Sequence, residues 1–403
     1  MRSRKQKWSV LALAVLLLAC FLSGCTQKNE EPVAPRQEKK EGLQVGMSFD
    51  SFVIERWLRD RDLFELTAKN LGAEVNVQVA NGDAKEQASQ IQYFIKKNVD
   101  VIVIIAVDGE QLSDVVAEAK AAGIQMISYD RLVMNADTDL YISFDNEKVG
   151  TLMGQAMVET LPEGGNIFAI YGSPADNNVS MVQKGFYDAI EGSGLEIVYS
   201  SYCDNWLAEL AFDAVEEGLA TTPRNLVGVM CGNDDLASQA FRALAENRLA
   251  GKVVLVGQDA ELSACQRIVE GTQTMTVYKP VEQLAQKAAE FACALGYQKM
   301  LAEGRIEKKD IPDIALERAE ELKKLDKISD FSDHAGEDGK TAKLENNIYV
   351  TADENGVEAE IGGNVPYYSI EPVAVTKENM DEVIIGSDFH TAEDVYLNVE
   401  NGK

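Results

Sequence analysis

The feature that most constrains the fold of this chain is a regular alternation of short apolar runs with segments of helical period. The apolar runs include LQVGMSF (43–49) and VDVIVIIAV (99–107), the second of which is rich in β-branched residues. The same alternation restarts at NIFAIYG (166–172) and continues to residue 258. We expect one helix ending near Leu71 and others over residues 84–97, 110–122, 178–192, 206–219 and 235–248. This alternation is typical of parallel sheets that are covered by helices on both faces.

The two halves of the pattern also resemble each other. Residues 101–131 and residues 226–260 each read as a strand, a helix and a second strand that ends in a polar cluster. The chain has 403 residues, which exceeds the length at which one hydrophobic core usually stops growing. We therefore predict an α/β protein with two Rossmann-like open parallel-sheet domains.

The first 25 residues differ from the rest of the chain. Four basic residues precede the apolar stretch WSVLALAVLLLACF, and LSGC (22–25) follows it, which is the order of a secretory signal. The last four residues resemble the lipobox of bacterial lipoproteins, so we expect lipid on Cys25 and an extracytoplasmic protein anchored to the cell membrane. A single transmembrane anchor is the alternative, because the apolar run is near the lower length limit for a span. Residues 26–42 are polar and are expected to form a flexible tether.

The acidic charge excludes one class of partner. The chain carries 66 acidic and 38 basic residues, for a formal net charge of −28. Such a surface repels nucleic acid and anionic lipid headgroups, so the lipid on Cys25 and not a basic patch would hold the protein to the membrane.

Four cysteines remain beyond the signal and the lipobox, and none forms a CxxC pair. They are Cys203, Cys231, Cys265 and Cys293. A metal site is therefore not expected. An extracytoplasmic location permits disulfides, although buried free thiols are the simpler state.

Polar residues follow the apolar runs at the positions where a site is expected. In open α/β sheets, ligands bind outside the carboxyl ends of the strands. The residues found there are Asp50, Asn81, Asp108, Asp130 and Arg131 in the first half, and SPADNN (173–178), DNW (204–206), NDD (233–235) and Asp259 in the second. No GxGxxG or GxxxxGK[ST] motif follows a strand, so a glycine-rich phosphate cradle and a nucleotide cofactor are not expected. A helix N-cap explains any single Asp or Asn equally well, but it does not explain the whole set.

This mixture of side chains suits a neutral polyol. Carboxylates and amides accept hydrogen bonds from sugar hydroxyls, while arginine, lysine and asparagine donate to them. An indole ring can cover the apolar face of a pyranose.

Several motifs resemble the bacterial D-xylose-binding proteins of the periplasmic sugar-binding family, which supplies ABC importers. They are GMSFDSFVIERWLRDRD, VQVANGD, SYDR, DLYISFDNEKVG, GSPADNN, DNWL, CGNDDLA, GQDAEL and GTQTMTVYKP. The resemblance covers residues 43–304 and 365–396, and it implies a type I periplasmic binding protein with a three-strand hinge between the domains. The hinge crossings are expected near residues 143–146, 276–279 and 371–375.

The resemblance also implies a set of sugar-binding residues. They are Arg56, Asp130, Arg131, Asp176, Asn178, Trp206, Asn233, Asp259 and Lys279, with Trp206 stacked on the ring. No catalytic residue, metal or cofactor is implied. In the helix after the first strand, Trp57 is expected in the core, whereas Arg59 and Arg61, which sit among Asp60, Asp62 and Glu65, are expected on a solvated or locally paired surface.

The resulting domain assignment has two discontinuous lobes. Residues 43–143 and 277–304 form the N-terminal lobe, residues 144–276 and 365–403 form the C-terminal lobe, and residues 305–364 form an acidic insertion of unknown role. The dipeptide Asn355-Gly356 lies within alternating residues and predicts a β-hairpin in that insertion.

The expected function is capture of a monosaccharide, D-xylose above other aldoses, by a monomeric binding protein that delivers it to an ABC permease. A sensor that presents the closed form to a membrane kinase or chemoreceptor is the alternative, and so is binding of glucose, galactose, arabinose or ribose. A glycosidase with paired carboxylates is a weaker hypothesis, because the resemblance is to a family without catalysis. A sugar-dependent repressor would need a helix-turn-helix where this chain has a signal peptide.

Overall fold

The computed structural model describes residues 41–222, 225–329, 341–343, 349–352, 358–361 and 364–399. The predicted signal peptide, Cys25 and residues 26–40 of the predicted tether lie outside these ranges. Among the helices in them, none combines the length and the apolar character that a membrane span requires.

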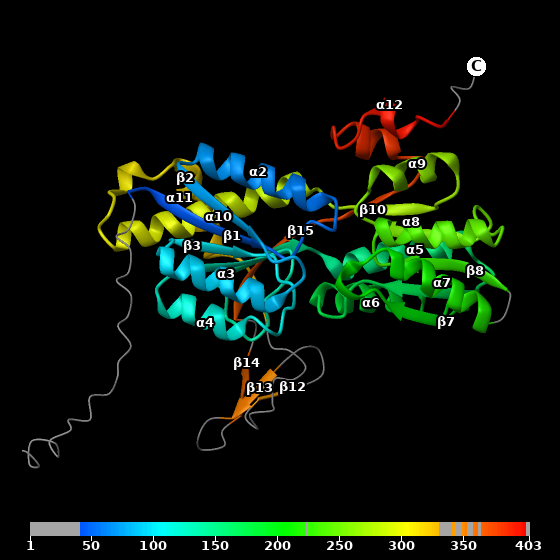
Figure 1. The fold of residues 1–403 in the computed structure, drawn as a ribbon, viewed down its shortest axis with the longest axis horizontal. Helices are drawn as coiled ribbons and strands as arrows, with labels where there is room; N and C mark the ends of the chain where they lie inside the picture. The colour runs from blue at the N-terminus through cyan, green and yellow to red at the C-terminus, as the bar shows by residue number, and fades with distance from the viewer. Residues whose placement is uncertain are drawn as a thin grey trace, which may run out of the picture. The chain divides into compact units, whose positions relative to one another are not determined.

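The first lobe is built on a seven-stranded sheet with the order β11-β15-β5-β4-β3-β1-β2 (Figure 1). Its strands are β1 (Leu43–Phe49), β2 (Ala73–Val79), β3 (Val101–Ile104), β4 (Gln125–Tyr129), β5 (Leu140–Phe144), β11 (Lys327–Ile328) and β15 (Val365–Ile370). Its helices are α2 (Arg56–Asn70), α3 (Ala84–Lys97), α4 (Ser113–Ala121), α10 (Val281–Ala302) and α11 (Asp313–Leu322). Ile102 and Ile104 pack in one cluster with α3 and α4, whereas Val101 and Val103 pack in the main core. Both faces of the sheet are therefore buried, which explains the continuous apolar runs.

The second lobe is built on a six-stranded sheet with the order β16-β10-β9-β8-β6-β7. Its strands are β6 (Gly165–Tyr171), β7 (Leu195–Tyr202), β8 (Leu226–Cys231), β9 (Val254–Gln258), β10 (Met275–Tyr278) and β16 (Val373–Val375). Its helices are α5 (Asn146–Thr160), α6 (Asn177–Ile190), α7 (Glu209–Thr221), α8 (Asp234–Glu246), α9 (Leu262–Glu270) and α12 (Ala392–Val395). The predicted pair of open parallel-sheet domains is confirmed.

The chain crosses between the lobes three times. It passes from β5 to α5 at Asp145, from β10 to α10 at residues 279–280, and from β15 to β16 at residues 371–372. All three crossings lie at or beside the expected positions, and together they form the hinge.

One strand differs from the predicted domain assignment. Residues 365–370, which we placed in the C-terminal lobe, form β15 and pair in parallel with β5 of the first sheet. The rings of Tyr141 and Tyr367 stack there with centroids 4.9 Å apart, which strengthens this pairing. Among the described residues after 364, those from β16 onward pack with the second lobe.

The expected insertion is partly integrated into the first lobe. Helix α11 packs on α10, and Arg318 forms an ion pair of 2.6 Å with Glu290. The strands β12 (Thr341–Lys343), β13 (Tyr349–Ala352) and β14 (Glu358–Ile361) form a small antiparallel sheet. Thr351 pairs with Ala359, as expected for a hairpin around Asn355-Gly356, whose turn lies outside the described residues.

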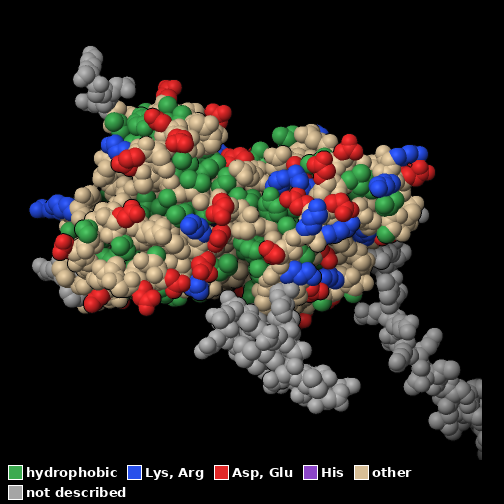
Figure 2. All heavy atoms as spheres, turned by 180° about the vertical axis from the view of Figure 1, so that it is seen from behind, with side chains coloured by type: hydrophobic (Ala, Val, Ile, Leu, Met, Phe, Trp, Pro, Cys, Tyr) green, Lys and Arg blue, Asp and Glu red, His purple; other side chains and the backbone are tan. Residues whose placement is uncertain are grey.

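The four cysteines of the globular region, Cys203, Cys231, Cys265 and Cys293, are buried as free thiols, which is the state that the sequence analysis favoured. On the surface, acidic side chains lie over both lobes, and the basic side chains of the first lobe lie among acidic ones (Figure 2).

Candidate functional site

A cavity between the two lobes collects most of the predicted site residues. Its open space is about 490 Å³, including its opening to solvent. Eight of the nine candidates line it: Arg56, Asp130, Arg131, Asp176, Asn178, Trp206, Asp259 and Lys279. They meet because the carboxyl ends of parallel strands from both sheets face the same gap. The ninth candidate, Asn233, is buried next to Gly232, which lines the cavity.

Several of these residues have unusual backbone conformations. The φ angles of Asp130, Trp206 and Asp259 are 61°, 58° and 94°. Residues other than glycine rarely adopt the left-handed region, and a bulky residue such as tryptophan is an outlier there. Such strain is concentrated at functional sites, because the surrounding structure must hold it in place.

The first lobe orients Arg56 through two carboxylates. Its Nη2 donates to Asp60 at 3.0 Å and to Asp130 at 2.8 Å, while Nη1 makes no hydrogen bond within the described ranges. Asp60, which the sequence analysis placed with the surface charges, is fully buried and also accepts a hydrogen bond from the Tyr129 hydroxyl. The two N–H bonds of Nη1 therefore stay available to a ligand in the cavity.

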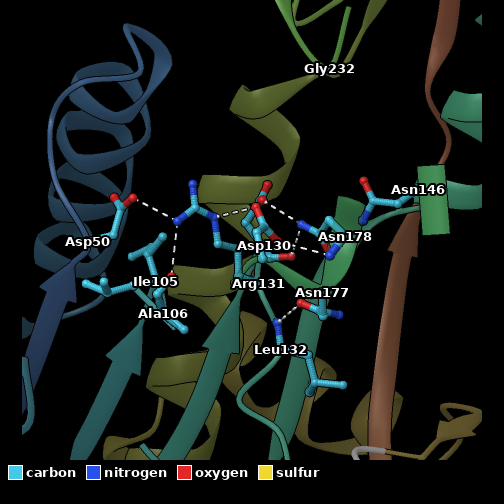
Figure 3. Close-up of polar contacts among 12 residues, drawn as sticks. Asp50, Ile105, Ala106, Asp130, Arg131, Leu132, Asn146, Asn177, Asn178 and Gly232 are labelled. Carbon is cyan, nitrogen blue, oxygen red and sulfur yellow. Dashed lines mark hydrogen bonds and ion pairs between the residues drawn. The ribbon is translucent and has the colours of Figure 1, made fainter. Parts of the chain in front are cut away.

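Arg131 connects the two lobes directly. Its Nη1 donates to Asp50 at 2.8 Å and to the Ala106 carbonyl at 3.1 Å, and its Nε lies 2.8 Å from Asp176 of the second lobe. Figure 3 shows Arg131 reaching from Asp50 toward Asn178 and its neighbours. The amide of Asn178 donates to the Asp130 carbonyl oxygen at 3.0 Å. These contacts hold the lobes together on one side of the cavity.

The carboxyl groups of the cavity differ in how they titrate. Burial raises the pKa of Asp176 and of Asp50, and the charge of Arg131 offsets this only in part. Burial acts on Asp130 in the same direction, but the charges of Arg56, Lys279 and Arg131 outweigh it and leave the pKa of Asp130 below its ordinary value. Asp130 is therefore held ionised as a hydrogen-bond acceptor.

Two glycines make room for the indole of Trp206. A Cβ atom on Gly172 would collide with the indole ring, and one on Gly232 would lie 2.6 Å from the Gly172 nitrogen and 3.3 Å from the ring. The Trp206 side chain is 7% exposed, and its Nε1 has no hydrogen-bond partner among the described residues. The ring therefore lines the cavity and keeps its N–H group available.

The N-cap explanation and the ligand explanation both apply to Asn233. Its Oδ1 accepts a hydrogen bond from the Leu236 backbone N–H at 2.9 Å and caps α8, but its Nδ2 is buried without a partner in the described part of the chain. Asp176 likewise caps α6 while it pairs with Arg131. A cap accounts for one atom of the Asn233 amide and leaves the other unused.

The sequence analysis missed several residues that line the cavity. Gln258 donates to the Gly232 carbonyl at 2.5 Å, and its Oε1 is buried with no partner among the residues that the structure describes. Asn146, at the start of α5, and Trp57 also line the cavity. Trp57 is buried as predicted, yet its ring lies 4.4 Å from the Arg56 guanidinium carbon. Gln258 precedes Asp259 in the GQDA motif, so its place at a strand end was the available signal.

Arg59 lies at the surface as expected, with its side chain 38% exposed, but its partners are not local. It donates to the Phe389 carbonyl at 3.1 Å and forms an ion pair of 3.2 Å with Glu282, both far away in sequence. Arg61 does pair locally, with Asp62. Arg59 thus links α2 of the first lobe to the C-terminal segment that packs on the second.

Comparison with known proteins gives a consistent match. The family described as "Periplasmic binding protein domain" matches residues 45–299. A D-xylose-binding periplasmic protein of Haemophilus influenzae is 41% identical over 358 residues, which cover 88% of this chain and 92% of that protein. The D-xylose-binding periplasmic protein of Escherichia coli is 45% identical over 63% of this chain and 78% of its own length.

A solved structure agrees with this match. An ABC transporter solute-binding protein from Clostridium phytofermentans with bound β-D-glucose has a TM-score of 0.65 and 26% identity, and the alignment covers 87% of this chain and 99% of that one.

Proposed function

The chain belongs to the periplasmic binding protein family, and from this premise we propose that it captures a monosaccharide, D-xylose before other aldoses, and delivers it to an ABC sugar importer. The family consists of extracytoplasmic binding proteins and not of enzymes, in agreement with the prediction. The observation that carries the proposal is the cavity between the lobes, which combines buried charged groups with an indole face.

The polar groups of the cavity match the hydroxyls of a neutral sugar. Within the described ranges, donors without a partner are Nη1 of Arg56, Nη2 of Arg131, Nε1 of Trp206 and Nδ2 of Asn233, and the buried Gln258 Oε1 is an acceptor without one. A hydroxyl group donates one hydrogen bond and accepts others, so a ring of hydroxyls can pair both kinds of group. The apolar face of the sugar would lie on Trp206.

Closure of the lobes follows from the division of the site. Arg56, Asp130 and Arg131 belong to the first lobe, whereas Asp176 and Trp206 belong to the second. Only the closed form offers all of these contacts at once, so a sugar that binds stabilises closure through its differential affinity. Hydrogen bonds to charged groups contribute about 1.5–3 kcal/mol each, against an association cost of roughly 4–15 kcal/mol. Several such hydrogen bonds together can therefore supply the binding free energy of roughly −8 kcal/mol that corresponds to a micromolar Kd.

A thermal-shift panel of pentoses and hexoses, followed by calorimetric titration, tests the proposal. We expect D-xylose to give the largest rise in melting temperature, because a tight pocket excludes the extra hydroxymethyl group of glucose. D-Glucose is the principal comparison, since a relative of known structure holds it. Equal shifts with both sugars would contradict the xylose preference, and no shift with any sugar would contradict the binding function.

The mature protein, we further propose, is a monomer that is anchored through lipid on Cys25. The support is the LSGC stretch after the apolar run. Metabolic labelling with a radioactive fatty acid should label the wild-type protein and not Cys25→Ser if lipid on Cys25 is the anchor. A wild-type protein in the membrane fraction without label would make the apolar run itself the anchor. Size-exclusion chromatography with light scattering tests the monomer.

A further inference from the structure

A second cavity lies beside the first and contains about 590 Å³ of open space, including its opening to solvent. It is lined by Asp50, Ser51, Val53, Asn81, Gly82, Val107, Arg131, Ser173, Asn205, Trp206 and Leu207. Arg131 and Trp206 line both cavities, which means that the two spaces adjoin at these side chains.

The strand order places the outer cavity on the side of the cleft away from the hinge. The crossings leave from β5, β10 and β15, whereas β2 and β7 lie at the opposite edges of the two sheets. Asn81 follows β2, and Asn205 follows β7, so both edges contribute to the outer cavity. It therefore occupies the mouth of the cleft, and the inner cavity lies between it and the hinge.

The lining of the outer cavity resembles a sugar subsite in its chemistry. At its base, Asp50, Ser51 and Ser173 are at most 8% exposed, while Asn81 and Asn205 are exposed at its rim. These groups supply carboxylate, hydroxyl and amide functions.

Several donors that face this space are unused. The side chains of Ser173, Asn81 and Asn205, and Nη2 of Arg131, make no hydrogen bond to any residue in the described part of the chain. The hydroxyls of a second sugar ring could pair with them.

We propose that the outer cavity is a second sugar subsite, which holds the second ring of a disaccharide whose first ring occupies the inner cavity. The inference rests on the proposed function, because the inner ring must bind as described there. The disaccharide would pass beside Arg131 and Trp206, so that Trp206 contacts both rings. A monosaccharide would leave the outer cavity to water.

Titration with xylobiose, a β-linked disaccharide of two xylose units, tests the proposal against D-xylose. We expect wild-type protein to bind one xylobiose per chain and D-xylose to displace it. Val107 lines only the outer cavity, so Val107→Trp should fill the subsite. We expect this variant to raise the Kd for xylobiose about tenfold or more and to change the Kd for D-xylose less than about threefold. Val53→Trp is the second variant, because Val53 is 46% exposed at the rim and tolerates a large side chain if Val107→Trp does not fold.

Leu66→Trp on the surface of α2 is the matched control, since Leu66 is exposed and lines neither cavity. It should leave both affinities unchanged. If the wild type binds D-xylose and not xylobiose, the subsite is overturned and the proposed function stands. The same conclusion follows if Val107→Trp and Val53→Trp weaken the binding of both sugars equally. Failure to bind either sugar would overturn the proposed function itself.

Discussion

Replacing Asn233 separates its role as a helix cap from its proposed role as a sugar donor. Asn233 Oδ1 caps α8 through the Leu236 N–H at 2.9 Å, whereas its Nδ2 is buried and meets no partner in the described ranges. Serine also caps helices well, but it has no amide group, so Asn233→Ser keeps the first role and removes the second. Asn233→Ala removes both.

The two contacts predict different magnitudes in two measurements. Loss of an N-cap to alanine costs about 0.5–2 kcal/mol of stability, whereas serine retains most of it. Loss of one hydrogen bond to a ligand costs on the order of 1 kcal/mol, which is about fivefold in Kd. We therefore expect both variants to bind D-xylose about fivefold more weakly, and only Asn233→Ala to lower the free energy of unfolding of the sugar-free protein.

Isothermal titration calorimetry gives the affinities, and urea unfolding without sugar gives the stabilities. If Asn233→Ser binds D-xylose with wild-type affinity, Asn233 is a cap alone and the ligand role is refuted. If Asn233→Ser is as unstable as Asn233→Ala, the cap does not explain the stability difference.

Three further predictions address other parts of the structure. Trp206→Ala should raise the Kd for D-xylose at least about tenfold and Trp206→Phe less, because phenylalanine retains an aromatic face; equal losses in titration calorimetry would argue against stacking. Arg59→Ala should raise the Kd for D-xylose about two- to fivefold, because it breaks the link to Phe389 across the lobes. Arg61→Ala loses only the ion pair with the neighbouring Asp62 and should not change the Kd. Equal affinities of the two variants for D-xylose would contradict the role of the Arg59 link. Burial raises the pKa of Asp234 to about 7, so its stabilising contribution is complete below about pH 4 and is lost as the pH rises to 7. Asp234→Asn should make the free energy of unfolding, measured by urea melts, depend less on pH between pH 4 and 7. If the variant shows the same pH dependence as the wild type, Asp234 is not the group that causes it.

The positions of most candidate site residues could be predicted because of a geometric regularity. Asp130, Arg131 and Asp259 follow apolar strands directly, and the carboxyl ends of parallel strands converge on one edge of a sheet. The motifs then supplied Arg56 and Lys279, which strand ends alone would not have distinguished from surface charges. Every helix expected from the apolar period is present within a few residues of its predicted bounds.

Residues whose environment depends on distant partners were predicted poorly. Asp60 lies four residues after Arg56 and was assigned to a surface pair, but Tyr129 from β4 closes over it and buries it. Arg59 was assigned to the same surface, yet its partners Glu282 and Phe389 lie more than 200 residues away. Local spacing shows which side chains share a helix face and does not show what packs against that face.

The sequence by itself determined the elements and the chemistry of the site, because apolar period and strand-end polar residues are local properties of the chain. Only the tertiary structure decided that β15 joins the first sheet, that Arg131 meets Asp176 across the lobes, and that a second cavity opens beside Trp206. Each of these depends on two segments far apart in sequence that meet in space. Pairing of that kind is selected by the packing of the whole fold, and no single segment specifies it.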